Sequence, residues 1–180
     1  MLANLSPLRF VFPSHFYTVE VIADMNNIYG GLKGIGMRLD YEHIVRRIQG
    51  LFPNAPIGLR AFGALDFNDE GAIRFIQRVE HLGWDTYPVP LVNKKGQKNS
   101  DQDVIGVALM VAAARSGDTR AIVLITGDGD FALYFPLLRR DKVDVVVIAP
   151  SRKALSRLLL ESADRVFVLP EWAPDCLRRY

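Results

Sequence analysis

The stretch Ile122-Val123-Leu124-Ile125-Thr126-Gly127-Asp128-Gly129-Asp130-Phe131 joins a run of apolar, mostly β-branched residues to two aspartates separated by one glycine. Such a run is typical of a buried β-strand, and the aspartates follow its carboxyl end. Ligands of open α/β sheets bind in the crevice outside the carboxyl ends of the strands. The stretch therefore predicts a parallel sheet with an acidic site at one edge.

A second apolar run ends in the same way. Residues 18–23 are expected to form a strand that leads directly into Asp24, with Asn27 three residues further on. Neighbouring parallel strands end at the same edge of a sheet. We therefore expect Asp24 to lie beside Asp128 and Asp130.

Strands and helices alternate along the rest of the chain. This alternation predicts an α/β fold: a single three-layer α/β/α domain over residues 1–180, with a mainly parallel central sheet, a core at about 17–169 and short terminal extensions. The expected strands are 18–23, 57–65, 84–92 (at a sheet edge, because it contains two prolines), 120–126, 143–148 and 166–169. The expected helices are 41–51, 69–82, about 100–116, 131–140 and 151–162, the last capped by Ser151.

Residues 29–38 contain four glycines, at positions 30, 31, 34 and 36. This segment is predicted to be too rich in glycine for an ordered element and to form a mobile lip. Its glycines match neither the dinucleotide-binding nor the P-loop spacing, which argues against both kinds of nucleotide site.

The composition limits the class of protein. The chain has 180 residues, a formal net charge of +2 and one cysteine, Cys176, so it has no disulfide framework and no cysteine-rich zinc site. Neither a signal peptide nor a membrane-spanning segment is recognisable, and a cytoplasmic location is expected. The pI near 8.8 permits a nucleic-acid partner. The oligomeric state stays open, with a homodimer among the alternatives.

The candidate metal ligands are all carboxylates: Asp24, Asp101, Asp103, Asp128 and Asp130. Oxygen ligands without histidine or cysteine suit Mg²⁺ or Mn²⁺ and disfavour zinc. Such an ion can position a phosphate and lower the pKa of a bound water for attack at neutral pH. An aspartate that follows a strand is also a common turn or cap residue, and this structural interpretation stays open for each residue alone.

Five further residues are candidates for binding substrate: Asn27, Lys94, Lys95, Lys98 and Thr126. The three lysines precede Asp101, where they can hold a phosphate backbone, although lysines on an exposed loop are also ordinary solvated surface. Asn27 can orient substrate or belong to a turn, and Thr126 can contact a metal-bound water or simply end its strand.

Three motifs carry a resemblance to a known family. They are Asp24-Met25-Asn26-Asn27, Lys98-Asn99-Ser100-Asp101 and Thr126-Gly127-Asp128-Gly129-Asp130-Phe131. In this order they resemble the NYN domain family, specifically its LabA/DUF88-like branch within the PIN-like nucleases. The resemblance covers about residues 17–169 and continues through Ser156 to Ala163-Asp164.

The resemblance implies a parallel sheet between helices and an acidic, metal-dependent pocket that cleaves RNA. It assigns Asp24, Asp101, Asp128 and Asp130 as catalytic metal ligands and Asn27 as a residue that organises the site. Many relatives carry another aspartate about two turns after the Lys-x-x-Asp motif, where this chain has Gly106, Val107 and Ala108. Asp103 is a candidate to replace it.

Two functions from different classes follow. The favoured one is a Mg²⁺- or Mn²⁺-dependent ribonuclease that hydrolyses phosphodiester bonds. The alternative is a non-catalytic nucleic-acid-binding or regulatory module that keeps the acidic pocket. A small-molecule phosphohydrolase is disfavoured, because Asn26 stands where an Asp-x-Asp phosphatase has its second aspartate.

Overall fold

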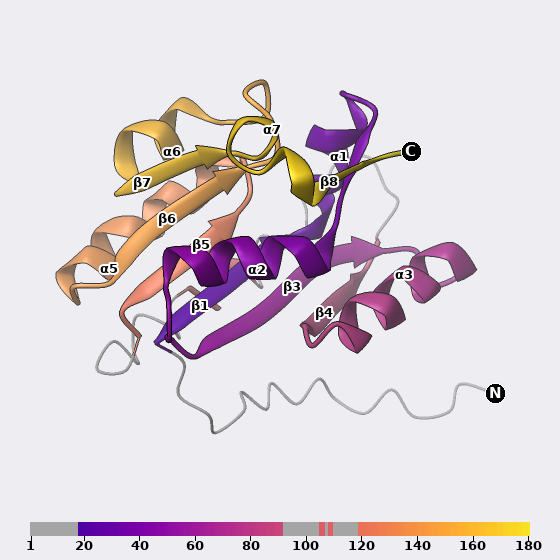
Figure 1. The fold of residues 1–180 in the computed structure, drawn as a ribbon, viewed down its shortest axis with the longest axis horizontal. Helices are drawn as coiled ribbons and strands as arrows, with labels where there is room; N and C mark the ends of the chain where they lie inside the picture. Colours follow the sequence, from indigo (N-terminus) through magenta and orange to yellow (C-terminus); the bar gives the residue numbers. More distant parts are fainter. Residues whose placement is uncertain (1–17, 92–104, 107, 110–118) are drawn as a thin grey trace.

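A parallel sheet forms the centre of the computed structural model, which describes residues 18–91, 105–106, 108–109 and 119–180. Within these residues six strands follow the order β4-β3-β1-β5-β6-β7, and every neighbouring pair is parallel (Figure 1). The strands are β1 (Val19–Asp24), β3 (Ile57–Leu65), β4 (Asp85–Pro90), β5 (Ala121–Ile125), β6 (Asp144–Ala149) and β7 (Arg165–Val168). The prediction of a parallel sheet is confirmed, and β4 lies at an edge as its prolines predict.

Helices cover both faces of the sheet, because the central strands bury mostly apolar residues on both sides. One face packs against α1 (Met25–Lys33), α2 (Tyr41–Leu51), α3 (Glu70–His81) and α7 (Leu169–Trp172). The other face packs against the helical residues 105–106 and 108–109, the 3₁₀ helix η1 (Gly129–Tyr134), α5 (Phe135–Arg140) and α6 (Arg157–Ser162). The predicted three-layer α/β class is therefore confirmed.

The glycine-rich segment is ordered, which corrects the prediction of a mobile lip at residues 29–38. Helix α1 runs through Gly30 and Gly31, and a short strand, β2 (Met37–Leu39), follows it. Helical glycine costs about 1 kcal/mol relative to alanine. Burial of Met25, Ile28 and Leu32 against the sheet outweighs this cost.

The helix expected at 151–162 begins later than predicted. Ser151 does not cap it: its Oγ accepts a hydrogen bond from the backbone N–H of Ala154 within a turn, and Ser156 caps α6 instead. The helix expected at 131–140 starts as η1 before it becomes α5.

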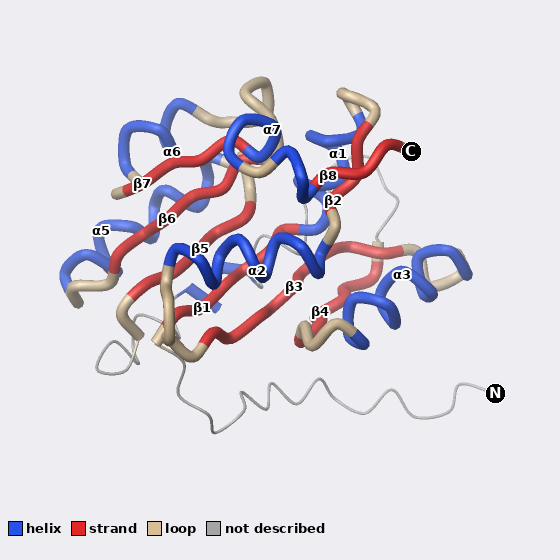
Figure 2. The backbone as a smooth tube through the Cα atoms, in the orientation of Figure 1, coloured by secondary structure: helices blue, strands red, loops and turns tan. Residues whose placement is uncertain are grey.

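The short extension predicted beyond residue 169 contains further elements. After α7 come the 3₁₀ helix η2 (Pro174–Cys176) and the strand β8 (Leu177–Arg179). Strand β8 pairs antiparallel with β2, and Figure 2 shows the two strands beside α1. Residues 177–179 are thereby joined to the strand that follows α1.

No helix in the described ranges combines the length and the apolar character that a membrane crossing requires.

Candidate functional site

The strand order reverses between β1 and β5. From β1 the chain moves outward through β3 and β4, then returns to the other side of β1 as β5 and continues through β6 to β7. The crevice at such a reversal, outside the carboxyl ends of the strands, is where open α/β sheets bind ligands. The register pairs Ala23 with Ile125, so Asp24 and Thr126 emerge next to each other at this position.

A hydrogen-bonded network joins the two strand ends. The hydroxyl of Thr126 donates to Oδ2 of Asp24 at 2.9 Å, and the backbone N–H of Asp128 donates to the same hydroxyl at 3.2 Å. Asp24 is only 4% exposed, and its Oδ1 also accepts from the backbone N–H of Asn27 at 3.0 Å. Thr126 thus orients both the Asp24 carboxylate and the 127–128 turn, and does not merely end its strand.

Asn27 makes a second link between the strand ends. Its Oδ1 accepts from the backbone N–H of Gly127 at 2.7 Å. The adjacent Asn26 bridges to β3 by bonding both backbone groups of Ala64. Asn27 therefore ties the Gly127 backbone to the first turn of α1, and its amide oxygen is committed to the protein backbone.

The same aspartates also cap helices, as the structural interpretation of each predicts. Asp24 caps α1, and Asp128 caps η1 by accepting the N–H of Asp130 at 3.0 Å. Capping uses one carboxylate oxygen and fixes the direction of the other. Capping and ligand binding are therefore compatible roles for Asp24 and Asp128.

A segment that the sequence did not assign to the acidic site supports the turn. Ala154 and Ser156 of the segment 150–156 pack against it, and the backbone N–H of Ser156 donates to the carbonyl of Gly127 at 2.9 Å. A Cβ on Gly127 would lie 2.1 Å from the backbone oxygen of Ala154, and one on Gly129 would lie 2.3 Å from Oγ of Ser156. Gly127 and Gly129 were the sequence signal of this close approach, since glycine is used where another part of the chain comes too near for a side chain.

Not every predicted ligand is brought together in the described residues. Asp130 follows Asp128 but is exposed. Asp101 and Asp103 lie outside the described residues, as do the three substrate-binding candidates Lys94, Lys95 and Lys98. Within the described residues no three histidine, cysteine or acidic side chains are grouped closely enough to hold a metal ion.

The chemistry of the donors nevertheless fits a hard divalent cation. Asp24, Asp128 and Thr126 offer only oxygen atoms, the ligands preferred by Mg²⁺ and Mn²⁺. Burial raises the pKa of the Tyr41 phenol, and the nearby charge of Asp24 raises it further. Tyr41 consequently stays neutral at pH 7 beside the carboxylate. A metal ion bound here would need further ligands, because the described residues alone do not group enough of them.

The position where many relatives carry another aspartate is closely packed in this chain. A Cβ on Gly106 would lie 2.3 Å from the hydroxyl oxygen of Tyr134, which belongs to η1. A larger residue at 106 and the present position of Tyr134 therefore exclude each other.

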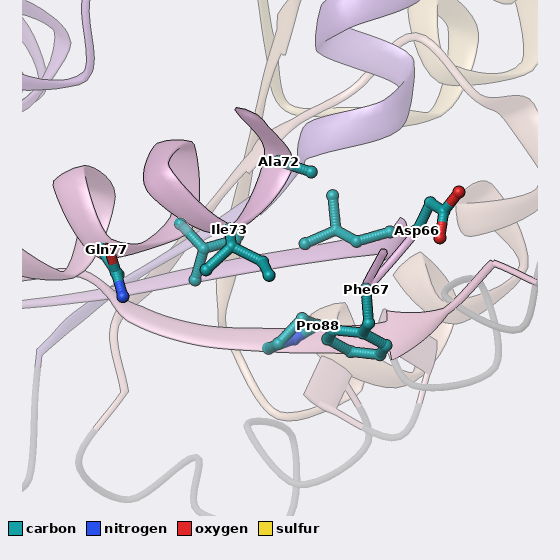
Figure 3. Close-up of a pocket in the computed structure, with 8 residues that line it drawn as sticks. Asp66, Phe67, Ala72, Ile73, Gln77 and Pro88 are labelled. Atoms are coloured by element: carbon teal, nitrogen blue, oxygen red, sulfur yellow. The ribbon is translucent and has the colours of Figure 1, made fainter. Parts of the chain in front are cut away.

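A hollow of about 230 Å³ lies away from this network, between α3 and the ends of β3 and β4 (Figure 3). Its lining is mostly apolar, with Leu65, Phe67, Ile73 and Pro88 among the contributors, and Asp66 is its only acidic residue. None of the candidate ligands lines this hollow, so it is not the predicted acidic pocket.

The network predicts a stability effect at Thr126. Thr126→Val removes the donor to a buried carboxylate and should lower the free energy of unfolding by about 1–3 kcal/mol. Thr126→Ser keeps the hydroxyl and should cost less than half as much. Urea denaturation of both variants measures the difference. A Thr126→Val protein as stable as the wild type would show that the hydroxyl contributes nothing to the folded state.

Comparison with known proteins places the fold and the family. The structure superimposes on the crystal structure of a protein of unknown function from Vibrio parahaemolyticus RIMD 2210633 with a TM-score of 0.70 and 18% sequence identity, covering 89% of this chain and 97% of that one. This similarity shows a shared fold. No curated protein matches the sequence significantly. Residues 18–170 match the NYN domain, including both strand-end motifs of the network, and the chain therefore belongs to the NYN domain family.

Proposed function

We propose that this protein is a Mg²⁺- or Mn²⁺-dependent ribonuclease that acts at the carboxyl ends of β1 and β5. The observation that carries the proposal is the Asp24–Thr126–Asp128 network at the strand reversal of a domain whose family belongs to the PIN-like nucleases. A buried carboxylate oriented by a hydroxyl and a backbone N–H is preorganised, so no free energy is spent on ordering it when substrate binds.

Each proposed residue has a distinct role. Asp24 and Asp128 hold the metal, and Asp130 contributes from the exposed side of the turn. Asp101 or Asp103 supplies the remaining carboxylate, which the described residues alone do not provide. Thr126 and Asn27 act as positioning residues through their hydrogen bonds.

The metal would supply a Lewis acid for the phosphate and a water of lowered pKa. The protein would contribute the fixed oxygen donors, while Lys94, Lys95 and Lys98 would bind the phosphate backbone. RNA is favoured over DNA as the substrate because the family resemblance points to RNA.

The direct test is incubation of purified protein with labelled single-stranded RNA, and separately with DNA of the same sequence, in Mn²⁺, Mg²⁺ or EDTA. The expected result is metal-dependent cleavage of RNA. Tight RNA binding without cleavage under every metal condition would instead support the alternative, a regulatory nucleic-acid-binding module.

Metal binding can be measured without any reaction. Mn²⁺ should raise the melting temperature, because it binds the folded state preferentially, and should lose its free-ion electron paramagnetic resonance signal on binding. Asp128→Asn should remove most of both effects, while the side-chain amide oxygen of Asn keeps the cap to the Asp130 N–H.

Asp66→Asn is the matched control for this measurement. Asp66 also follows the carboxyl end of a strand, and its Oδ1 accepts from the backbone N–H of Asn68, a bond that asparagine preserves. Asp66→Asn should respond to Mn²⁺ like the wild type. If Asp128→Asn does so too, Asp128 has only its capping role and the metal assignment fails.

A further inference from the structure

Two exposed tyrosines from distant parts of the chain meet beside the candidate site. Tyr29 on α1 and Tyr180 after β8 form an edge-to-face pair with ring centroids 6.4 Å apart. They are 54% and 63% exposed. Exposed aromatic rings of this size are the platforms on which proteins stack the bases of single-stranded nucleic acids.

Positive charge surrounds the pair. Nζ of Lys33 lies 5.2 Å from the centroid of the Tyr29 ring, and Arg38 of β2 acts electrostatically on Tyr180. Hydrogen bonding to Tyr29 raises the pKa of the Lys33 ammonium, which therefore stays charged at neutral pH. Residues 25–39 and 176–180 contain no acidic residue, so this surface, defined by Tyr29, Lys33, Arg38 and Tyr180, is complementary to a phosphate backbone.

The surface is held in place by specific contacts. Strand β8 pairs with β2, and Nη2 of Arg178 lies 2.9 Å from Oδ2 of Asp40, the residue that caps α2. The backbone N–H of Tyr180 also donates to the carbonyl of Gly36 at 3.3 Å. These contacts fix Tyr180 against the α1 side of the molecule, so that the two rings form a preformed platform.

The platform is continuous with the candidate site through one helix. Helix α1 begins at its cap Asp24, carries Asn27 in its first turn and presents Tyr29 and Lys33 on its exposed side, while Met25, Ile28 and Leu32 are buried. With a rise of 1.5 Å per residue, Tyr29 and Lys33 lie roughly 8 and 14 Å along the axis from Asp24. A strand bound on this side therefore passes within a few nucleotides of the carboxylates.

We propose that the surface of Tyr29, Lys33, Arg38 and Tyr180 binds single-stranded RNA, with bases stacked on the two tyrosines and phosphates paired with Lys33 and Arg38, and leads the strand to the Asp24–Asp128 site. The inference rests on the proposed function for the identity of the ligand. It adds a binding surface that is separate in sequence from the Lys94–Lys98 segment.

Binding is tested on the whole chain by fluorescence anisotropy with a labelled oligouridine in EDTA, which prevents cleavage. Tyr29→Ala and Tyr180→Ala should each weaken binding about 10-fold, whereas Tyr29→Phe and Tyr180→Phe keep the ring and should bind like the wild type. A thermal melt of each variant checks that it is folded. The same variants should change affinity for a duplex of matched length very little, because its bases are not free to stack.

The charges are tested by the salt dependence of the same binding. Lys33→Gln and Arg38→Gln should each flatten the slope of log affinity against log salt by about 0.7. Lys142→Gln is the control, because exposed Lys142 precedes the amino end of β6, whereas the candidate site lies at the carboxyl ends of the strands; this variant should leave the slope unchanged.

The proposal would be overturned if Tyr29→Ala and Tyr180→Ala both bound the oligouridine in EDTA as tightly as the wild type does. It would also be overturned if they lost as much affinity for the duplex as for the single strand. The cleavage assay gives the separate answer on function. If the wild type cleaves RNA and the tyrosine variants bind it unchanged, the ribonuclease proposal stands and the binding-surface proposal fails. If binding depends on the tyrosine rings but no RNA is cleaved, the binding-surface proposal stands and the ribonuclease proposal fails.

Discussion

Asp24→Asn should reduce RNA cleavage on the order of 100-fold or more, while RNA affinity measured in EDTA stays near that of the wild type. Asp24 is the most buried of the candidate ligands that the structure describes. Its carboxylate accepts from the N–H of Asn27 and from the hydroxyl of Thr126, and that hydroxyl accepts from the N–H of Asp128. The substitution is almost isosteric but removes the negative charge that would hold the metal. A loss in the chemical step without a loss in binding is the expected signature.

The measurement compares single-turnover cleavage rates of Asp24→Asn, Asp66→Asn and the wild type in Mn²⁺, together with their affinities in EDTA. Asp66→Asn should cleave at the wild-type rate, since none of the network contacts involves it. Cleavage by Asp24→Asn within a few-fold of the wild type would show that Asp24 serves only as the cap of α1, and that the reaction occurs elsewhere.

Gly127→Ala is expected to destabilise the protein by about 3 kcal/mol and to lower its melting temperature by roughly 6–12 °C. The added Cβ would lie 2.1 Å from the backbone oxygen and 2.6 Å from the carbonyl carbon of Ala154. Backbone atoms cannot move away as the end of a flexible side chain can. The 150–156 segment and the turn before Asp128 must therefore separate.

Gly50→Ala is the matched control for this effect. Gly50 lies in α2, and a Cβ there meets nothing within 4 Å, so alanine should raise stability by up to about 1 kcal/mol through its higher helix propensity. Differential scanning calorimetry of both variants checks the prediction. A Gly127→Ala protein that melts like the wild type would contradict the close packing of the 150–156 segment on the turn.

Local sequence patterns were sufficient for most of the sheet and for the residues at its edge. The apolar, β-branched runs that became β1, β5 and β6 are recognisable because a strand buried on both faces needs apolar side chains on both. The helices predicted at 41–51 and 69–82 begin within one residue of α2 and α3, because helical spacing of apolar residues and capping by Asp40 and Asp69 are local interactions. The strand-end motifs likewise predicted that Asp24 and Asp128 lie at the carboxyl ends of β1 and β5, where the structure has them, since parallel strands end at one edge.

Contacts between residues far apart in sequence decided the rest. The glycines of 29–38 predicted a mobile lip, yet α1 is stabilised by burial against a sheet whose later strands extend as far along the chain as Val168. The helix start at Ser156 in place of Ser151 depends on the Gly127 carbonyl, which accepts the Ser156 N–H. Neither effect can be read from a local window, because the favourable free energy comes from another part of the chain.

The sequence by itself therefore determined the α/β class, the family motifs and the two acidic strand ends, all of which depend on short-range periodicity and on the chemistry of individual side chains. Only the tertiary structure decided that Thr126 bridges Asp24 and the Asp128 turn, that residues 150–156 support this turn, and that Tyr180 lies against Tyr29. These features need a defined distance between groups that are as much as 151 positions apart in the chain. Such distances arise only when burial of the core sets the strand order and closes the loops between them.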